Sequence, residues 1–280
     1  MNSAVYDKIK ELISETGVLG VLALREQDGA ASPHLFTSVA DTTGLVLDPK
    51  WPLAKTVWRM ARDLPDGKSI GLVCRGCDMR ALEELVKAGQ LRPGAVRAIG
   101  VPCSAAQAEA CLCETPFPPG GEPAAGVDPL AAPDLERLCF EPGRLDLWRE
   151  NFSRCIKCYG CRNSCPICVC PSCKLEEDGY VTSGTVPPDP LAFHLIRAMH
   201  LADRCVGCGA CQESCPAGLP LLSLHLAVRK ALRDRTGYTS GTAAISPLLS
   251  AGKEEGPVGS AAPLWEDTLK GRREGGEHAG

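Results

Sequence analysis

The stretch that decides the fold is CIKCYGCRNSCP at residues 155–166, which returns as CVGCGACQESCP at residues 205–216, 50 positions later. Both copies follow the pattern CxxCxxCxxxCP, which is typical of bacterial proteins that hold two 4Fe-4S clusters. Three cysteines at this spacing wrap one short loop around a compact cluster. The fourth, before proline, is directed to the neighbouring cluster. The repeat therefore predicts two clusters in one unit of two-fold pseudo-symmetry.

The eight motif cysteines divide into two sets when the fourth ligands are exchanged. The first cluster is assigned to Cys155, Cys158, Cys161 and Cys215. The second cluster is assigned to Cys205, Cys208, Cys211 and Cys165. Zinc is the alternative, but it usually takes two separated pairs of ligands, which runs of four do not offer.

Further cysteines are candidates for a third iron–sulfur centre. The run CVCPSC follows the first motif directly and adds Cys168, Cys170 and Cys173. Cys74 and Cys77 form a separate CxxC at the end of an expected strand. The alternative for each of them is a buried, inert thiol.

The chain has 17 cysteines, so four remain after these assignments: Cys103, Cys111, Cys113 and Cys139. Each of the four is expected to be a buried or inert thiol when taken individually. Together they are numerous enough for a further centre, and their spacing does not decide between the two.

Residues 1–145 have the pattern of an α/β domain. Helical spacing is found over residues 4–15 and 53–62, and short apolar runs predict strands at 17–24, 45–47, 69–74 and 96–101. The clearest unit is SIGLVC-RGCD-MRALEELVKA, a strand, a turn and an amphipathic helix with Asp78 as its N-cap. The order strand, helix, strand predicts parallel pairing.

The rest of the chain completes an α+β fold, in which the N-terminal α/β domain is followed by a two-cluster ferredoxin-like domain with flanking helices. A Pro/Gly-rich connection is expected near residues 116–133. The ferredoxin-like domain is expected at 146–235, with a helical insertion whose His194 and His200 are interpreted as packing or surface residues. Residues 236–280 are predicted to form an extended or disordered tail.

Composition limits the kinds of binding partner and the cellular compartment that we expect for this protein. The net charge is −4 and the pI about 5.8, so no basic field attracts nucleic acid or an anionic membrane. The longest apolar run is too short to span a bilayer. The amino terminus lacks the features of a signal peptide, so a cytoplasmic location is expected. In a reducing compartment, so many cysteines indicate metal binding rather than disulfides.

Two segments carry a family resemblance. SIGLVCRGCDMRALEELVKAGQL at residues 69–91 resembles the beta-subunit family of deazaflavin-coenzyme-reducing hydrogenases and formate dehydrogenases. The cysteine-dense run and HLIRAMHLADRCVGCGACQESCPAGLPL resemble the iron–sulfur subunits found beside heterodisulfide-reductase-like and formate or aldehyde oxidoreductase complexes. The resemblance implies an α/β domain joined to ferredoxin-type clusters, and electron transfer between a partner's redox centre and a flavin.

Flavin binding is an open alternative. The α/β part is short for a full flavin- and deazaflavin-binding domain, and the chain has no GxGxxG fingerprint. If a flavin binds, the turn at residues 75–80 is where we expect it, the alternative being a packed strand–helix connection.

The leading hypothesis is an iron–sulfur electron-transfer subunit of an anaerobic oxidoreductase complex. It would relay single electrons through two or more 4Fe-4S clusters, with a catalytic subunit and another redox protein or ferredoxin as partners in a hetero-oligomer. The sequence has no Ser–His–Asp, paired-carboxylate or P-loop pattern that would indicate catalysis by the chain itself. Two alternatives are a flavin-containing subunit that reduces a deazaflavin-type coenzyme, and a metal-stapled scaffold without redox function.

Overall fold

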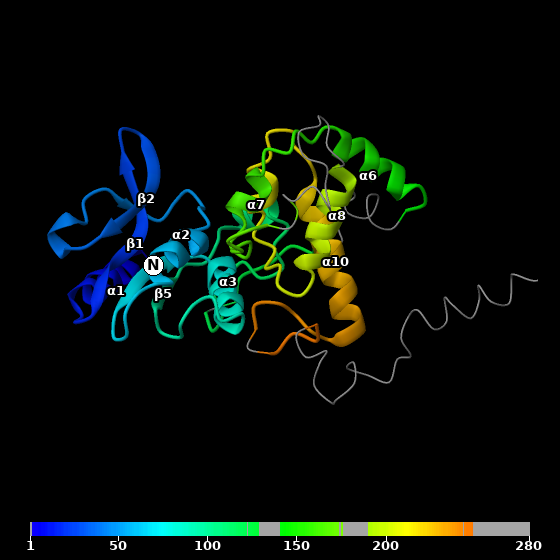
Figure 1. The fold of residues 1–280 in the computed structure, drawn as a ribbon. Helices are drawn as coiled ribbons and strands as arrows, with labels where there is room; N and C mark the ends of the chain where they lie inside the picture. Colours follow the sequence, from blue (N-terminus) through cyan, green and yellow to red (C-terminus); the bar gives the residue numbers. More distant parts are fainter. Residues whose placement is uncertain are drawn as a thin grey trace, which may run out of the picture.

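The computed structural model describes residues 2–121, 123–128, 141–173, 175, 190–242 and 244–248. They form one β-sheet and a set of helices, so the predicted mixture of α and β structure is confirmed (Figure 1). Figure 1 shows the strands at one end of the molecule and the helices α6, α8 and α10 at the other. The described residues contain no helix that combines the length and the apolar composition needed to cross a bilayer. Cys139 and part of the predicted 116–133 connection lie outside the described residues.

The sheet is built around a fully buried central strand. Its members are β1 (Val18–Gln27), β2 (Ala30–Phe36), β3 (Leu45–Val46), β4 (Ser69–Cys74) and β5 (Val96–Gly100). The order is β2-β1-β4-β5, with β3 also beside β1. β4 runs parallel to β5, as the strand–helix–strand pattern predicted, and also parallel to β1, while β2 and β3 are antiparallel to β1. Every residue of β4 is buried, which explains its uninterrupted apolar run.

The strand β2 was not predicted. Its sequence, AASPHLF, contains a proline and leaves only Phe36 buried, so it lacks the apolar run that marks the other strands. A local signal does precede it, because Asp28 and Gly29 both adopt positive φ angles, 54° and 77°. An Asp-Gly pair with this backbone is a typical two-residue hairpin turn.

Helices cover both faces of the sheet. The first half contains α1 (Asn2–Ser14), α2 (Ala54–Ala61), α3 (Gly76–Lys87) and α4 (Ala105–Ala110), with a short 3-10 turn at Val39–Asp41. Because alternate residues of a strand face opposite sides, Val21 and Ala23 of β1 pack against α1, while Leu22 and Leu24 pack against α2 and α3. Burial of both faces fixes the register of the central strands.

Asp78 ties the start of α2 to the start of α3. The helix α3 begins at Gly76, so Asp78 lies within the first turn and is not the N-cap that the sequence predicted. Its buried carboxylate accepts hydrogen bonds from the backbone N–H groups of Leu53 (2.8 Å), Ala54 (2.9 Å) and Arg75 (3.1 Å). Burial raises the pKa of Asp78, and these three donors oppose the rise. One side chain therefore satisfies three backbone donors at two helix termini.

The second half is helical among the described residues. It contains α6 (Arg144–Ser153), α7 (Gly160–Ser164), α8 (Pro190–His200), α9 (Ala210–Glu213) and α10 (Leu221–Thr236). The helix α8 corresponds to the predicted helical insertion that carries His194 and His200, and α10 to a predicted flanking helix. Phe152, Phe193 and Leu221 form the centre of their core.

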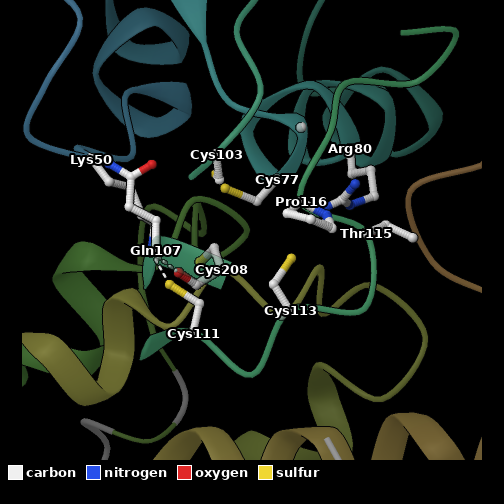
Figure 2. Close-up of a pocket in the computed structure, with 12 residues that line it drawn as sticks. Lys50, Cys77, Arg80, Cys103, Gln107, Cys111, Cys113, Thr115, Pro116 and Cys208 are labelled. Carbon is white, nitrogen blue, oxygen red and sulfur yellow. Dashed lines mark hydrogen bonds between the residues drawn. The ribbon is translucent and has the colours of Figure 1, made fainter. Parts of the chain in front are cut away.

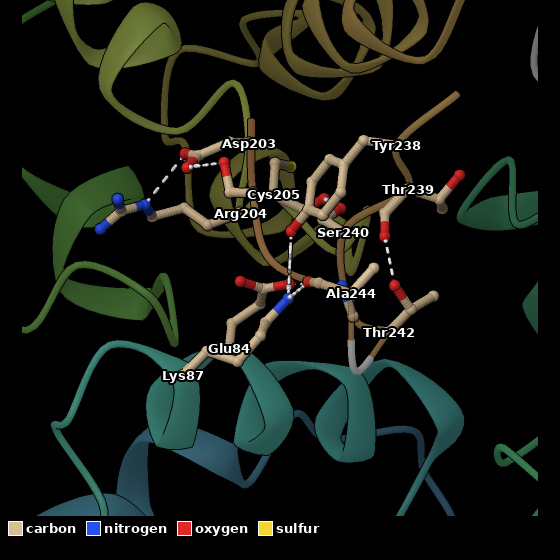
Figure 3. A network of polar contacts seen from close by, with 12 residues as sticks. Glu84, Lys87, Asp203, Arg204, Cys205, Tyr238, Thr239, Ser240, Thr242 and Ala244 are labelled. Atoms are coloured by element: carbon tan, nitrogen blue, oxygen red, sulfur yellow. Dashed lines mark hydrogen bonds and ion pairs between the residues drawn. The ribbon is translucent and has the colours of Figure 1, made fainter. Parts of the chain in front are cut away.

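The start of the predicted tail is packed, which corrects part of that expectation. Tyr238 and Ser240 are buried after α10, and Tyr238 donates a hydrogen bond to Glu84 of α3 (3.3 Å) (Figure 3). Glu84 also forms an ion pair with Lys87 (2.7 Å), while Ser246 donates to Asp203 (2.6 Å). The described residues after α10 therefore close over α3. Residues 249–280 of the predicted tail lie outside the described residues.

The two halves share a hydrophobic core. Ile167 directly follows the first cysteine motif, and Val206 lies within the second. Both belong to the same buried cluster as Leu53 and Val57. The first half, which contains the sheet (the sheet half), is thus in direct apolar contact with the second half, which contains the cysteine motifs (the cysteine half). The cysteine loops pack against α2.

We predict that Asp78→Ala strongly destabilises the protein. Three buried N–H groups would lose their acceptor, at a cost of at least about 3 kcal/mol in the free energy of unfolding. The midpoint of thermal unfolding, followed by circular dichroism under anaerobic conditions, should fall by about 10 °C. The matched control is Asp66→Ala, whose side chain is 98% exposed and lies 3.4 Å from Arg92. Equal midpoints for the two variants would contradict this role of Asp78.

Candidate metal centre

The two cysteine motifs meet along the short helices α7 and α9. Ser164 Oγ lies 2.9 Å from the Oγ of Ser214, its equivalent in the second motif, and donates to the carbonyl oxygen of Ala210 at 3.1 Å. A Cβ atom on Gly160 would lie only 2.8 Å from the Ser214 carbonyl oxygen, so this approach requires glycine. The sequence repeat is therefore also a pairing in space.

Both cysteine loops use the left-handed backbone conformation at equivalent positions. Lys157 and Tyr159 have φ angles of 51° and 58°, and their equivalents Gly207 and Gly209 have 65° and 78°. Successive turns of this kind direct backbone N–H groups inward. The Lys157 N–H lies 3.4 Å from Cys155 Sγ and donates to it. The loops thus present N–H donors to sulfur, as a negatively charged cluster requires.

The structure brings together the four cysteines predicted for the first cluster: Cys155, Cys158, Cys161 and Cys215. Burial raises the pKa of the Cys161 thiol, Arg197 opposes the rise, and the other three thiols add to it. Burial likewise raises the pKa of Cys155, with further contributions from Cys215 and Cys158. Cys215 therefore lies with the cysteines of the other motif.

The four cysteines predicted for the second cluster also lie together: Cys205, Cys208, Cys211 and Cys165. Burial raises the pKa of Cys211 to about 12, Arg197 opposes the rise, and the Cys205 and Cys165 thiols add to it, as does Cys161 of the first set. Burial also raises the pKa of Cys208, where Cys77 adds to the effect of Cys165 and Cys211. Cys165 is the member that comes from the first motif.

The five cysteines predicted to form a third centre line three different recesses. Cys168, Cys170 and Cys173 line a cavity of about 400 Å³ beside α8. Cys74, at the end of β4, lines a recess that Val46 of β3 also lines, whereas Cys77 of α3 lines another recess together with Cys208 of the second motif. The strand end and the following helix turn direct Cys74 and Cys77 to different recesses. Joint ligation by these five thiols stays a prediction from the sequence.

Arg197 of α8 lies between the two sets, and the sequence did not predict this. Its side chain is buried, and its Nη2 donates to the Cys161 carbonyl oxygen at 2.9 Å, while Nη1 lies 2.8 Å from Nε2 of His225. Burial alone would lower the pKa of Arg197, but Cys165 of the second set and Cys161 of the first help to raise it. A permanent positive charge therefore lies beside thiols of both sets.

His194 contacts the first set directly. Its Nε2 lies 3.3 Å from Cys155 Sγ, and its ring stacks on Phe152 with centroids 4.5 Å apart. Burial lowers the pKa of His194 to about 4, with Arg197 contributing, so the ring is neutral near pH 7. The expected packing role is thus combined with a contact to sulfur, while His200 is exposed. The spacing of His194 and Arg197, three residues apart on one helix, is a signal that could have indicated both.

Lys55 connects the sheet half to the cysteine half. From α2, its Nζ donates to the carbonyl oxygens of Cys168 (2.8 Å) and Arg162 (3.2 Å). Burial lowers the pKa of this ammonium group, and the nearby cysteine thiols oppose that effect. The lysine thereby holds the end of the first motif against α2.

The donor chemistry of both sets fits 4Fe-4S clusters. Each set supplies four thiols, and backbone N–H groups and Arg197 add the hydrogen bonds and positive charge that such clusters use. Among the residues that the structure describes, no three His, Cys, Asp or Glu side chains are grouped closely enough to hold a single metal ion.

Comparisons with known proteins agree with this chemistry. Residues 197–217 match the family model of a 4Fe-4S binding domain. The chain is 42% identical over 97 residues to the F420-dependent formate dehydrogenase subunit beta of Methanocaldococcus jannaschii, which covers 35% of this chain and 26% of the relative. It is 44% identical over 97 residues to the F420-dependent formate dehydrogenase 1 subunit beta of Methanococcus maripaludis, covering 35% and 25%. The resemblance to the beta-subunit family is confirmed, and the chain matches about a quarter of the length of these two relatives.

We predict that Arg197→Met lowers the reduction potentials of the bound clusters. Removal of a buried positive charge beside the thiolates disfavours each added electron, by on the order of 50 mV or more. Arg197→Lys keeps the charge and should shift the potentials less. The measurement is an anaerobic redox titration followed by electron paramagnetic resonance (EPR). As a control, Arg149→Met removes a 60% exposed charge and should leave the potentials unchanged. Equal shifts in the methionine and lysine variants at position 197 would show that its charge is not responsible.

Proposed function

We propose that this chain is the iron–sulfur electron-transfer subunit of an anaerobic oxidoreductase complex and that it passes single electrons through two 4Fe-4S clusters. The observation that supports the proposal is the pairing of the two motifs in space, with Ser164 Oγ 2.9 Å from Ser214 Oγ, which brings Cys215 near the cysteines of the first motif and Cys165 near those of the second. An exchange of fourth cysteines between the motifs would hold two clusters close together in one rigid unit. Two neighbouring one-electron carriers favour electron transfer over a purely structural use.

The chain's own residues prepare the two sites. Each bound cluster would accept or release one electron without a change in its ligands. The thiolates hold the iron, the Lys157 N–H donates to the sulfur of Cys155, and Arg197 stabilises the negative charge of both sets. Phe152 and Phe193 belong to the same buried cluster as Cys155 and Cys161 of the first set.

The first set is also where a partner can approach. Cys158 is exposed, and Ile156, two residues before it, leaves 59% of its surface in solvent. An exposed ligand beside an exposed apolar side chain offers a short path for electrons and a surface for contact. We propose that a catalytic subunit or a second redox protein docks here, which agrees with the naming of both relatives as subunits.

A second candidate is a flavin-containing subunit that reduces a deazaflavin-type coenzyme. The names of the two relatives favour it, because both are called F420-dependent. The two candidate functions differ in one cofactor, because only the second requires a bound flavin. Anaerobic purification with flavin, iron and acid-labile sulfide measured on the same sample separates them.

We predict that the exchanged cysteines act on the cluster of the other motif. In the reduced protein, Cys215→Ser should change the same EPR signal as Cys158→Ser, because both remove a ligand of the first cluster. Cys165→Ser should change the same signal as Cys211→Ser. Cys170→Ser, which alters an exposed thiol outside both sets, is the control and should leave both signals intact.

Two results would contradict the proposal. If Cys215→Ser instead behaves like Cys211→Ser, each motif holds its own cluster and the exchanged pairing is wrong. Clusters that dithionite does not reduce reversibly would exclude electron transfer and favour the scaffold alternative.

A further inference from the structure

Four cysteines that the proposed function does not use lie around one recess. Cys77, Cys103, Cys111 and Cys113 line it, and their side chains come from three separate segments of the sheet half (Figure 2). The side chains that line the recess leave a cavity of only about 10 Å³ between them. Cys208 of the second set lines the same recess.

The topology of the sheet explains why these thiols meet. Cys77 lies in the first turn of α3, directly after β4, and Cys103 follows β5. Because β4 and β5 are parallel neighbours, their carboxyl ends lie at the same edge of the sheet. Cys111 ends α4, and Cys113 comes two residues later. Backbone hydrogen bonds hold both loop positions, from the Cys103 N–H to the Pro116 carbonyl (2.7 Å) and from the Cys113 N–H to the Ala108 carbonyl (2.9 Å).

The thiols are close enough to influence one another. Burial raises the pKa of Cys103, and the Cys113 and Cys111 thiols add to the rise. Burial also raises the pKa of Cys77, where Cys103 is one of the contributing neighbours. Cys77 and Cys111 are buried, while Cys103 and Cys113 are half-buried.

We propose that Cys77, Cys103, Cys111 and Cys113 bind a third 4Fe-4S cluster beside the second one. A set of four thiols without a histidine or a carboxylate is the donor set of this cluster type. Zinc also accepts four thiolates, but the recess continues into the second set at Cys208, which favours a redox centre in series with it. This assignment shares only Cys77 with the third centre predicted from the sequence.

Lys50 connects the recess to the second set. Its side chain is only 9% exposed, and its Nζ donates to Cys111 Sγ at 2.7 Å and to the Cys208 carbonyl oxygen at 2.9 Å. Glu213 lies 3.3 Å from the same nitrogen. A buried positive charge thus lies between the two thiol sets, as Arg197 does between the first and second sets.

The inference deepens the proposed function, on which it rests, by lengthening the electron path from two clusters to three. One electron would pass from the reduced second cluster to the third cluster. The second cluster is thereby oxidised by one electron and the third is reduced by one electron. No bond forms or breaks and no proton moves. The electron comes from the proposed redox partner, and dithionite replaces that partner in the test.

The test is the iron and acid-labile sulfide content of the full chain after anaerobic purification. The wild-type protein should contain about twelve irons and twelve sulfides, by the four-iron count of each cluster. The double variant Cys111→Ser/Cys113→Ser should lose about a third of both and keep the two EPR signals of the motif clusters. The control Cys170→Ser should keep all three clusters.

A separate pair of variants leaves every thiol in place, in case the double variant does not fold. Lys50→Met removes the charge beside Cys111, and Lys50→Arg retains it. The methionine variant should shift the reduction equilibrium of the third EPR signal by about tenfold relative to the arginine variant. Equal behaviour of these two variants would count against a cluster at Cys111.

The remaining outcomes separate this inference from the proposed function. About eight irons in the wild-type protein, with both motif signals present, would overturn the third cluster alone. One zinc that disappears in the double variant would also overturn the third cluster. Loss of iron in Cys170→Ser would show that the CVCPSC group binds the third cluster and that the proposed ligand set is wrong. A protein without acid-labile sulfide would overturn the proposed function itself.

Discussion

The burial of Arg197 is the constraint on which the cysteine half depends. Thiolates packed near one another in a low-dielectric interior repel, and a cation among them reduces that repulsion. A guanidinium group keeps its charge under these conditions and donates in several directions. The Arg197 guanidinium group therefore contacts the Cys161 carbonyl and His225 at the same time. The helix α8 therefore does more than connect the two motifs, because it carries the charge that lets them lie close together.

A second constraint is the attachment of the cysteine loops to a rigid base. Short loops with left-handed residues at Lys157 and Tyr159 bury little apolar surface of their own. They gain support from α2, through Ile167 in the shared core and through Lys55, which donates to two carbonyl groups of the first motif and its extension. Tyr238, after α10, closes the other side against α3. The sheet half thus fixes the positions of the sulfurs even where it contributes no ligand to the two motif sets.

The features that sequence patterns predicted are those encoded over short distances. The motif spacing and the strand that ends at Cys74 each depend on residues that are close together in the sequence. The features that were missed depend on contacts between distant segments. Asp78 is recognised as an acceptor for α2 only when the two helices are placed together, and Arg197 as a partner of both sets only when both motifs surround it. For Cys103 and its neighbours the spacing left a further centre undecided, because only the parallel pairing of β4 and β5 brings Cys77 and Cys103 to one edge of the sheet.

The order of the thiol sets has a consequence for how electrons would travel. The first set ends at the exposed Cys158, and the proposed third set ends at the half-buried Cys103 and Cys113 near α4. Arg197 and Lys50 lie at the two junctions between successive sets. A positive charge at each junction lowers the energy of an electron on either side, so neither junction becomes a barrier to reduction of the next cluster. With the proposed third set, the path is accessible at two different places, at the exposed Cys158 and at the half-buried Cys103 and Cys113, which suits a carrier between two partners.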